Sequence, residues 1–222
     1  MTNLHYEFTG ETTVNRVGLT LHRIRATRDL PHFGVKTGDV GGWIEHTGNL
    51  KGHAWVGDEA QVFGNAQVFG NAQVFGNAQV YRDALVYGNA NVFGNAQVYD
   101  NAQVYGNALV FGYVYVNSYA QVYGSAKVFG NVGVFGDARI KKTTHYFHAI
   151  TCTSTPLKLT LTRQKAGKHL IRMGCWSGTI DELEALISSE TWVETKGKAA
   201  TEARPEMEIL ASLMRASIER WK

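Results

Sequence analysis

The chain has 222 residues, 18% of them charged, and a formal net charge of +3, which suits one or two domains. So small a surplus does not indicate a nucleic-acid partner, and no apolar run approaches the roughly 18 residues of a membrane span. No secretory pattern opens the sequence, and two cysteines are too few for a disulfide framework. We therefore expect a soluble cytoplasmic protein with reduced thiols.

Residues 1–42 predict an amino-terminal β cap. Polarity alternates over residues 4–28 on either side of Gly10, and Val17, Leu19 and Leu21 fall on one face of such strands. A cap is expected because the open strand edges at the end of a repeat structure need cover.

Residues 43–140 predict a parallel β-helix. Every sixth residue from Ile44 to Ile140 is Ile, Leu or Val, in a unit typified by Ala-Gln-Val-Tyr-Gly-Asn. Strand alternation turns the aliphatic residue and the alanine inward, and the glutamine and the aromatic residue outward. Gly-Asn suits the intervening turn because both residues tolerate positive φ. Three units make an eighteen-residue coil, so the segment predicts about five stacked coils.

The eighteen-residue period assigns outward side chains to three faces, which we name face one, face two and face three after the strands of Val62, Val68 and Val74. Face three is the most apolar, and a continuous apolar column of this kind predicts an interface. A homotrimer with C3 symmetry is the expected assembly. The alternatives are a stabilising aromatic ladder, or cover by the carboxy-terminal domain. The predicted interface residues are Trp55, Phe75, Phe93, Leu109, Phe111 and Phe129.

The corner after face one departs from Gly-Asn at eighteen-residue intervals. A polar strip that binds a ligand or partner is one interpretation, and tolerated drift at an exposed corner is the other. The residue types form no recognisable catalytic set, which favours drift. The candidate residues are Arg82, Asp83, Asp100, Ser118 and Tyr119.

Residues 141–222 predict a small α+β domain. Strands are expected over residues 145–154 and 157–173, the second segment turning at Ala166-Gly167. Thr179 and Glu182 have the spacing of a capping box for a helix through about Ser188.

Pro205 fits the first turn of a last helix. Residues 195–203, rich in Lys, Thr and Ala, are the expected flexible segment.

Few polar residues of this domain and of the cap suggest a site. On a strand, His145 and His148 would point to opposite faces, so we expect no metal ion there. Cys152 and Cys175 are expected to be buried thiols. Basic side chains would make pockets suited to phosphate if an oligomer brought them together; otherwise they are solvated strand surface. They are Arg23, Arg25 and Arg28 near the cap, and Arg163, Lys165, Lys168 and Arg172 near residues 157–173.

Residues 43–140 resemble the hexapeptide-repeat, left-handed β-helix superfamily, which implies a left-handed coil and a parallel trimer. The whole chain resembles a group of phage and prophage proteins. These combine Leu-His-Arg-Ile-Arg-Ala (residues 21–26), Asp-Val-Gly-Gly-Trp-Ile (residues 39–44), Gly-Asn-Ala repeats and an end similar to residues 174–183. The resemblance implies a phage origin.

The superfamily includes acyltransferases, γ-type carbonic anhydrases and non-enzymes, so its fold does not fix a function. Its acyltransferases imply a histidine near a subunit cleft and often an excursion loop, and its carbonic anhydrases imply three metal-binding histidines. Here no histidine follows His53 within the repeat, and no loop interrupts it. We therefore favour a non-catalytic protein without cofactor or metal.

Three functions stay open. The first is an oligomeric phage-type binding protein, such as a counter-defence protein that captures a nucleotide immune signal, a small anionic ligand, or a host protein. The second is a structural or assembly protein of a phage particle, favoured by the aromatic and glutamine ladders and opposed by the caps, which should prevent end-to-end growth. The third is an acyltransferase, on fold analogy alone.

Overall fold

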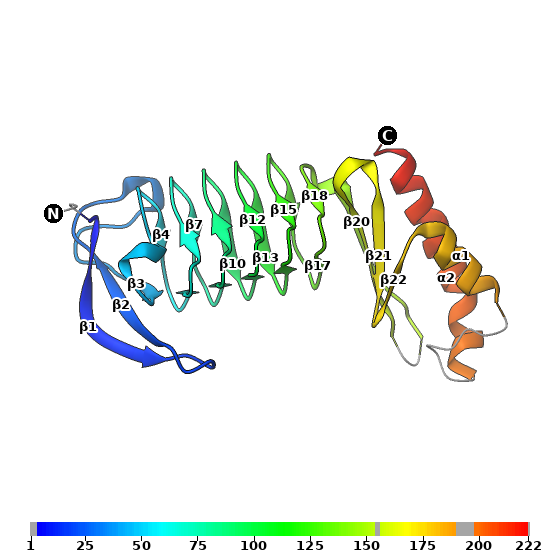
Figure 1. Ribbon diagram of the computed structural model, residues 1–222, viewed down its shortest axis with the longest axis horizontal. Helices are drawn as coiled ribbons and strands as arrows, with labels where there is room; N and C mark the ends of the chain where they lie inside the picture. The colour runs from blue at the N-terminus through cyan, green and yellow to red at the C-terminus, as the bar shows by residue number, and fades with distance from the viewer. Residues whose placement is uncertain (1–3, 154–155, 190–197, 222) are drawn as a thin grey trace. The chain divides into compact units, whose positions relative to one another are not determined.

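The computed structural model describes residues 4–153, 156–189 and 198–221. The chain divides into two compact units, residues 1–137 and 138–222. The first contains a parallel β-solenoid with an antiparallel pair of strands at its amino-terminal end, and the second an antiparallel sheet with two helices (Figure 1). No helix within the described residues is long and apolar enough to cross a membrane.

Three sheets of short parallel strands form the solenoid, which has about five turns. Strands of neighbouring turns pair eighteen residues apart, as Gln61 with Gln79 and Val62 with Val80. Face one consists of β3 (Val40–Ile44), β5 (Gln61–Val62), β8 (Gln79–Val80), β11 (Gln97–Val98), β14 (Tyr115–Val116) and β17 (Gly133–Val134). Face two consists of β6 (Gln67–Val68), β9 (Leu85–Val86), β12 (Gln103–Val104) and β15 (Gln121–Val122). Face three consists of β4 (Trp55–Val56), β7 (Gln73–Val74), β10 (Asn91–Gly94), β13 (Leu109–Gly112) and β16 (Lys127–Val128). The predicted mainly β fold with a parallel solenoid is confirmed, while its left-handed sense stays a prediction.

The interior of the solenoid is a narrow column of aliphatic side chains. The inward valines, such as Val92 and Val110, and the alanines beside them are fully buried. Even Val114 and Val132, which replace alanine, are no more than 1% exposed. Backbone hydrogen bonds join successive turns, as from Gln79 N to Ala96 O at 2.9 Å. Such close packing leaves little space for a larger side chain.

The amino-terminal strands extend face one. β1 (Tyr6–Val14) pairs antiparallel with β2 (Thr20–Ala26), and β2 pairs antiparallel with β3. Gly10, expected between the strands, lies inside β1, where the register is irregular between Phe8 and Thr12. The turn comes later, where Asn15 Oδ1 accepts hydrogen bonds from the backbone N–H groups of Val17 and Leu19, both at 3.0 Å.

Placing Val17 on one strand face with Leu19 and Leu21 was therefore wrong, because it lies in this turn with 69% of its surface exposed. Leu21 is fully buried, and Leu19 packs against the cluster that contains it.

Gly41 and Gly42 let β3 approach the next turn of the solenoid closely. A Cβ atom on Gly41 would lie 2.6 Å from the Trp55 ring and 2.6 Å from Val56 O. On Gly42 it would lie 2.7 Å from Ala60 O. All three distances are too short for non-bonded atoms, so the Gly-Gly pair is needed where the cap meets the first coil.

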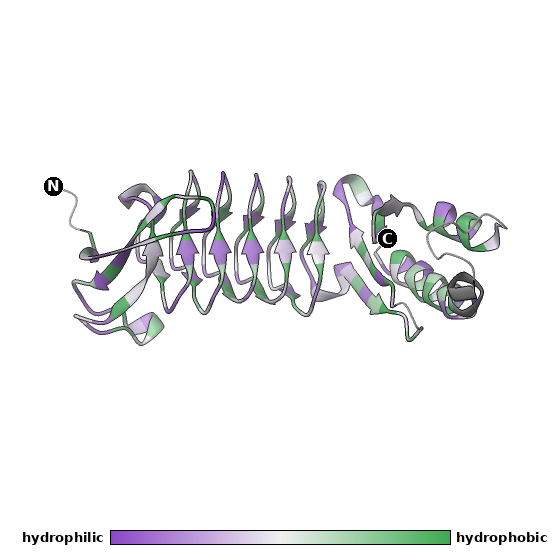
Figure 2. Cartoon of the chain, turned by 90° about the horizontal axis from the view of Figure 1, so that it is seen from below, coloured by the Kyte–Doolittle hydropathy of each residue, from purple (hydrophilic) through white to green (hydrophobic). Residues whose placement is uncertain are grey.

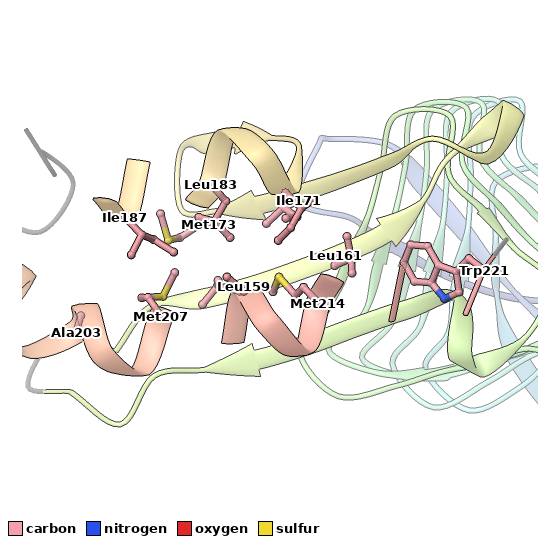
Figure 3. Packing of buried hydrophobic residues seen from close by; sticks show 12 residues of the cluster. Leu159, Leu161, Ile171, Met173, Leu183, Ile187, Ala203, Met207, Met214 and Trp221 are labelled. Atoms are coloured by element: carbon pink, nitrogen blue, oxygen red, sulfur yellow. The ribbon is translucent and has the colours of Figure 1, made fainter. Parts of the chain in front are cut away.

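The second unit packs two helices against its sheet. The strand order is β19 (Tyr146–Ile150), β20 (Lys158–Arg163), β21 (His169–Met173) and β22 (Trp176–Gly178), all antiparallel. Figure 3 shows the core between this sheet and α1 (Ile180–Ser188) and α2 (Lys198–Glu219). Its labelled residues include Leu161, Met173, Leu183 and Met214. Short elements complete the description: η1 (Pro31–Phe33), η2 (Thr47–Asn49), β18 (Arg139–Ile140), η3 (Thr143–His145) and η4 (Lys165–Gly167).

In this unit, the sequence correctly predicted a helix cap and a hairpin turn, which both depend on neighbouring residues. The capping box of α1 is present: Glu182 N donates to Thr179 Oγ1, and Thr179 N donates to the Glu182 carboxylate. The hairpin turns at Ala166 and Gly167, at φ 56° and 76°.

The prediction for Pro205 was wrong, because α2 begins at Lys198 and Pro205 lies inside it. The expected flexible segment is helical from Lys198, while residues 195–197 lie outside the described residues.

Candidate functional site

Face three carries a continuous aromatic stack. The rings of Phe75, Phe93 and Phe111 lie 4.8 Å apart between centroids, and Phe129 follows Phe111 at 5.3 Å. The first three are half-buried, as is Leu109, whereas Phe129 is 46% exposed. The aromatic ladder within the chain is therefore present, and its rings remain partly accessible to solvent.

Trp55 does not share this exposure. Only 3% of its surface is accessible, since β3 crosses beside its ring at Gly41. The phenylalanine column of face three begins at Phe75, as the sequence predicted, whereas Trp55, in the adjacent column with Leu109, is not accessible. Contact between copies through this column stays a prediction.

Face one carries a comparable stack that the chain itself covers. Phe63 and Tyr81 stack at 5.1 Å, and Tyr81 and Tyr99 at 4.9 Å. Leu21 and Trp43 pack on Phe63, which is only 7% exposed. Figure 2 shows the β1–β2 hairpin in front of the first turns of the solenoid. The amino-terminal strands thus cover the first turns of face one.

The polar corner after face one is a set of residues bonded to one another. Arg82, Asp100 and Ser118 adopt positive φ, between 58° and 60°, at the turn position that glycine usually occupies. Arg82 forms an ion pair with Asp100, and Ser118 N donates to Asp100 Oδ2 at 3.3 Å. Asp83 accepts from Asn65 Nδ2 at 3.0 Å. Tyr119 is 66% exposed.

These bonds link equivalent positions of successive turns, so they give Arg82, Asp83, Asp100 and Ser118 partners within the chain. The ligand-binding interpretation of this corner stays a prediction.

The basic residues of the cap are paired with carboxylates. Arg23 lies 2.8 Å from Glu59 and over the Trp43 ring, 4.7 Å from its centroid. Arg25 lies 2.7 Å from Glu7. Hydrogen bonds from Trp43 Nε1 and from Arg23 lower the pKa of Glu59, which keeps this carboxylate ionised beside Arg23. A phosphate would have to compete with these carboxylates.

The basic residues of the β20–β21 hairpin point to different faces. In the register of the two strands, Arg163 lies opposite His169, and Arg172 lies opposite Thr160. Because side chains alternate along a strand, Arg163 lies on the face of Leu161, whereas Arg172 lies on the opposite face. Lys165 lies in the turn between the strands. The hairpin by itself does not bring these three cations to one place.

The histidines and thiols of the second unit do not converge. His145 ends η3, while His148 lies in β19 with its Nδ1 atom 3.2 Å from Leu159 O. Burial lowers the pKa of both histidines. Cys152 and Cys175 are exposed, so the expectation of buried thiols was wrong. No three His, Cys, Asp or Glu side chains form a metal-binding group in the described part of the chain.

A pocket that the sequence did not predict lies where the loop before β3 meets the first turns of the solenoid. Its volume is about 420 Å³, within the usual range of ligand sites. Its lining combines apolar, charged, imidazole and amide side chains. It is lined by Arg28, Asp29, Leu30, Pro31, His32, Phe33, His53 and Asn71.

The lining of this pocket carries both a guanidinium group, Arg28, and a carboxylate, Asp29. Arg28 forms no ion pair within the described residues. Burial lowers the pKa of the neighbouring His5, and the charges of Arg28 and His53 lower it further, against a hydrogen bond to Ala54 that raises it. Asp29 is the one acidic group of the lining, and it accepts hydrogen bonds from Thr37 N and Oγ1 at 2.8 and 2.7 Å.

Arg28 is among the basic cap residues that the sequence predicted to suit phosphate, but His32 and His53 were missed, because His53 comes from a separate segment. The available signal was the clustering of arginine, histidine and phenylalanine over residues 28–33.

Comparison with known proteins agrees with the solenoid. A family model described as the YdcK beta-solenoid repeat matches residues 66–82 and 102–116. Both segments lie within the repeat. The fold and the family match together define the class of the protein as a β-solenoid repeat protein. No curated protein matches the chain.

Proposed function

We propose that the protein is an oligomeric, non-catalytic binding protein that holds a small anionic ligand in the pocket of Arg28, His32 and His53. The single observation that carries this proposal is the convergence of these basic groups on a cavity of about 420 Å³. A guanidinium group without an ion pair is well suited to phosphate, since it donates several hydrogen bonds in one plane.

The apolar lining residues of the same pocket suggest a nucleotide as the ligand. Phe33 and Pro31 border the cavity, and an aromatic ring beside a cation can hold a base while the cation holds the phosphate. Asn71 adds an amide that can donate and accept. The resemblance to phage proteins favours a nucleotide signal of host defence, with a host protein as the alternative partner.

A depletion assay tests ligand capture. The full chain is incubated with a panel of cyclic nucleotides and ADP-ribose derivatives, and unbound and released ligand are measured before and after heat denaturation. Depletion followed by recovery of intact ligand supports capture. No depletion of any compound contradicts it.

Paired variants test the location of the site. Arg28→Ala should abolish capture, whereas Arg25→Ala should leave it unchanged, because Arg25 is paired with Glu7 outside the pocket lining. Equal effects of both variants would contradict the assignment.

The same assay addresses catalysis. His32 and His53 line the pocket and are able to transfer protons. Conversion of a depleted ligand to product would therefore replace the binding proposal by an enzymatic one. Acyl transfer would be tested by adding an acyl donor.

The second candidate function is structural assembly, favoured by the accessible column of face three. Phe75, Phe93, Phe111 and Phe129 form an apolar stripe, and burying such a stripe between copies stabilises an oligomer. A closed trimer is the assembly that we propose for the binding protein. Continuous fibres, seen as an unbounded mass by light scattering, would favour an assembly role in a phage particle instead.

A further inference from the structure

A polar groove runs along face one, beneath the turn of the β1–β2 hairpin. Its volume is about 590 Å³. Its floor is the outward row of β5, β8, β11 and β14, and one wall is the hairpin turn at Asn15 and Arg16. The opposite wall is the corner between face three and face one, with Asn77, Asn95 and Tyr113. All of these elements belong to the first unit.

The amides in this groove differ from equivalent amides elsewhere on the solenoid. On the corner after face two, Asn89 accepts from Asn71 at 3.3 Å and donates to Asn107 at 3.1 Å, so that corner is a closed ladder. Asn77 and Asn95 hold the same position after face three. No side-chain hydrogen bond of either is found within the described residues.

The glutamines of the floor show the same difference only in part, because Gln97 accepts a hydrogen bond from the Tyr81 hydroxyl group at 3.2 Å. On face two, Tyr87 and Tyr105 donate through their hydroxyl groups to Gln103 and Gln121 in the next turn. On face one, the residue sixteen positions before Gln79 is Phe63, which has no hydroxyl group. In the described part of the chain, the Gln79 amide has no side-chain partner.

The hairpin turn contributes one donor without an acceptor. Asn15 Oδ1 accepts two backbone hydrogen bonds, which fixes the orientation of the amide. Its Nδ2 atom is buried, and within the described residues it donates to no acceptor. A buried donor in this state is costly, so an acceptor that reached it after a small shift of the turn would stabilise the occupied groove.

Tyrosines complete the lining at the far end. Tyr115 continues the glutamine row and is 39% exposed, and Tyr113 on the adjacent corner is 59% exposed. The carboxylate of Glu59 at the near end is paired with Arg23, and among the described residues Arg16 forms no ion pair. Apart from Arg16 and the paired Glu59, the polar lining of the groove is a row of neutral amides with aromatic faces.

We propose that this groove binds an oligosaccharide. Amides that both donate and accept match hydroxyl groups, and exposed tyrosines offer flat apolar surface to the faces of sugar rings. The rungs of the floor repeat at about 4.8 Å, close to the length of one sugar residue in an extended chain. A nucleic acid would instead call for several cations along its phosphates.

Glycan binding by the full-length protein in its assembled state tests this proposal. An array of neutral and uronic-acid oligosaccharides is screened, and binders are measured by isothermal titration. Retention of at least one oligosaccharide is expected. Retention of none, or displacement of the bound glycan by a peptide or by single-stranded DNA, would overturn the proposal.

Matched variants locate the site. Asn95→Ala should weaken glycan binding about five- to tenfold, the effect of one lost hydrogen bond, while Asn89→Ala at the equivalent turn position should change it less than about twofold. Tyr115→Ala should weaken binding about tenfold, with the 66% exposed Tyr119 replaced by Ala as control. Equal losses in the paired variants would overturn the assignment.

Asn95→Ala should also leave nucleotide capture intact, and Arg28→Ala should leave glycan binding intact. Failure of one site therefore does not imply failure of the other.

Discussion

Face one and face three of the solenoid come from the same repeat, yet the structure treats them differently. Each carries a column of stacked aromatic rings at about 4.8–5.3 Å. On face one, Leu21 and Trp43 cover the column at its first turn, where Phe63 is 7% exposed. On face three, only Trp55 is covered, and Phe129 is 46% exposed. A repeat therefore creates equivalent surfaces, and the non-repeating segments decide which of them stay accessible.

The largest expected effect concerns face three, whose phenylalanine column is accessible. The double variant Phe93→Asp, Phe111→Asp should reduce the oligomer to single chains of 24.5 kDa, because two carboxylates cannot be buried without partners. Light scattering after size-exclusion chromatography measures the mass.

The control is Tyr87→Asp, Tyr105→Asp on face two, whose rings also stack at 4.9 Å. An unchanged mass of the face-three variant, or an equal loss in the control, would contradict face three as the contact.

The next largest effect concerns face one, whose first turn is covered by the amino-terminal strands. Leu21→Ala should lower the free energy of unfolding of the first unit by about 2–5 kcal/mol, since a fully buried leucine is lost from the cluster over Phe63. Hydrogen exchange of β1 and β2 amides in increasing urea reports this loss. Val17→Ala, at a 69% exposed residue of the same hairpin, should change it by less than about 0.5 kcal/mol. Similar values for both variants would show that the hairpin does not depend on this contact.

The cover of face one should also depend on pH. The pKa of Glu59 is lowered by hydrogen bonds from Trp43 and Arg23. A lowered folded-state pKa means that Glu59 stabilises the hairpin fully above its ordinary pKa of 4.5, and that this contribution is lost as the pH falls through the lower value.

Exchange protection of the Trp43 indole N–H should accordingly drop at acidic pH. Glu59→Gln should show weaker protection at pH 7 and no further drop at this step. If Glu59→Gln still lost the full protection at acidic pH, a group other than Glu59 would be responsible for the transition.

The smallest effect concerns the corner that follows face one. Arg82→Gly removes an exposed ion pair with Asp100, worth about 0–1 kcal/mol, and relieves a positive φ of 60°. The free energy of unfolding should therefore change by less than about 1 kcal/mol, whereas Arg82→Ala keeps the unfavourable φ and should be the less stable of the two. Thermal denaturation compares them. A glycine variant less stable than the alanine variant would show that the backbone geometry is not strained there.

Prediction from the sequence succeeded where a rule acts on neighbouring residues. The buried positions of Val92 and Ala90, the turn positions of the Gly-Asn pairs and the capping box of Thr179 and Glu182 follow from strand alternation, positive φ and local hydrogen bonds. It failed for Pro205, because the packing of α2 on the sheet extends the helix through a position that local preference assigns to its start.

The candidate sites were harder to predict than the fold. Arg23 and Arg25 looked available, but carboxylates from other segments pair with them. Arg28 was predicted with them, while His32 and His53 were not, and these three residues line one pocket because the loop of residues 28–33 lies beside the first turns of the solenoid.

The sequence by itself determined the solenoid: its period, its inward aliphatic column and its aromatic ladders, since each of these depends on strand alternation within one six-residue unit. Only the tertiary structure decided which copies of a repeated side chain remain available. Asn89 is engaged in a ladder while Asn95 lines a groove, and Phe63 is covered while Phe129 is exposed. The physical reason is that availability depends on contacts between residues far apart in the chain, which a periodic sequence does not encode in the repeat itself.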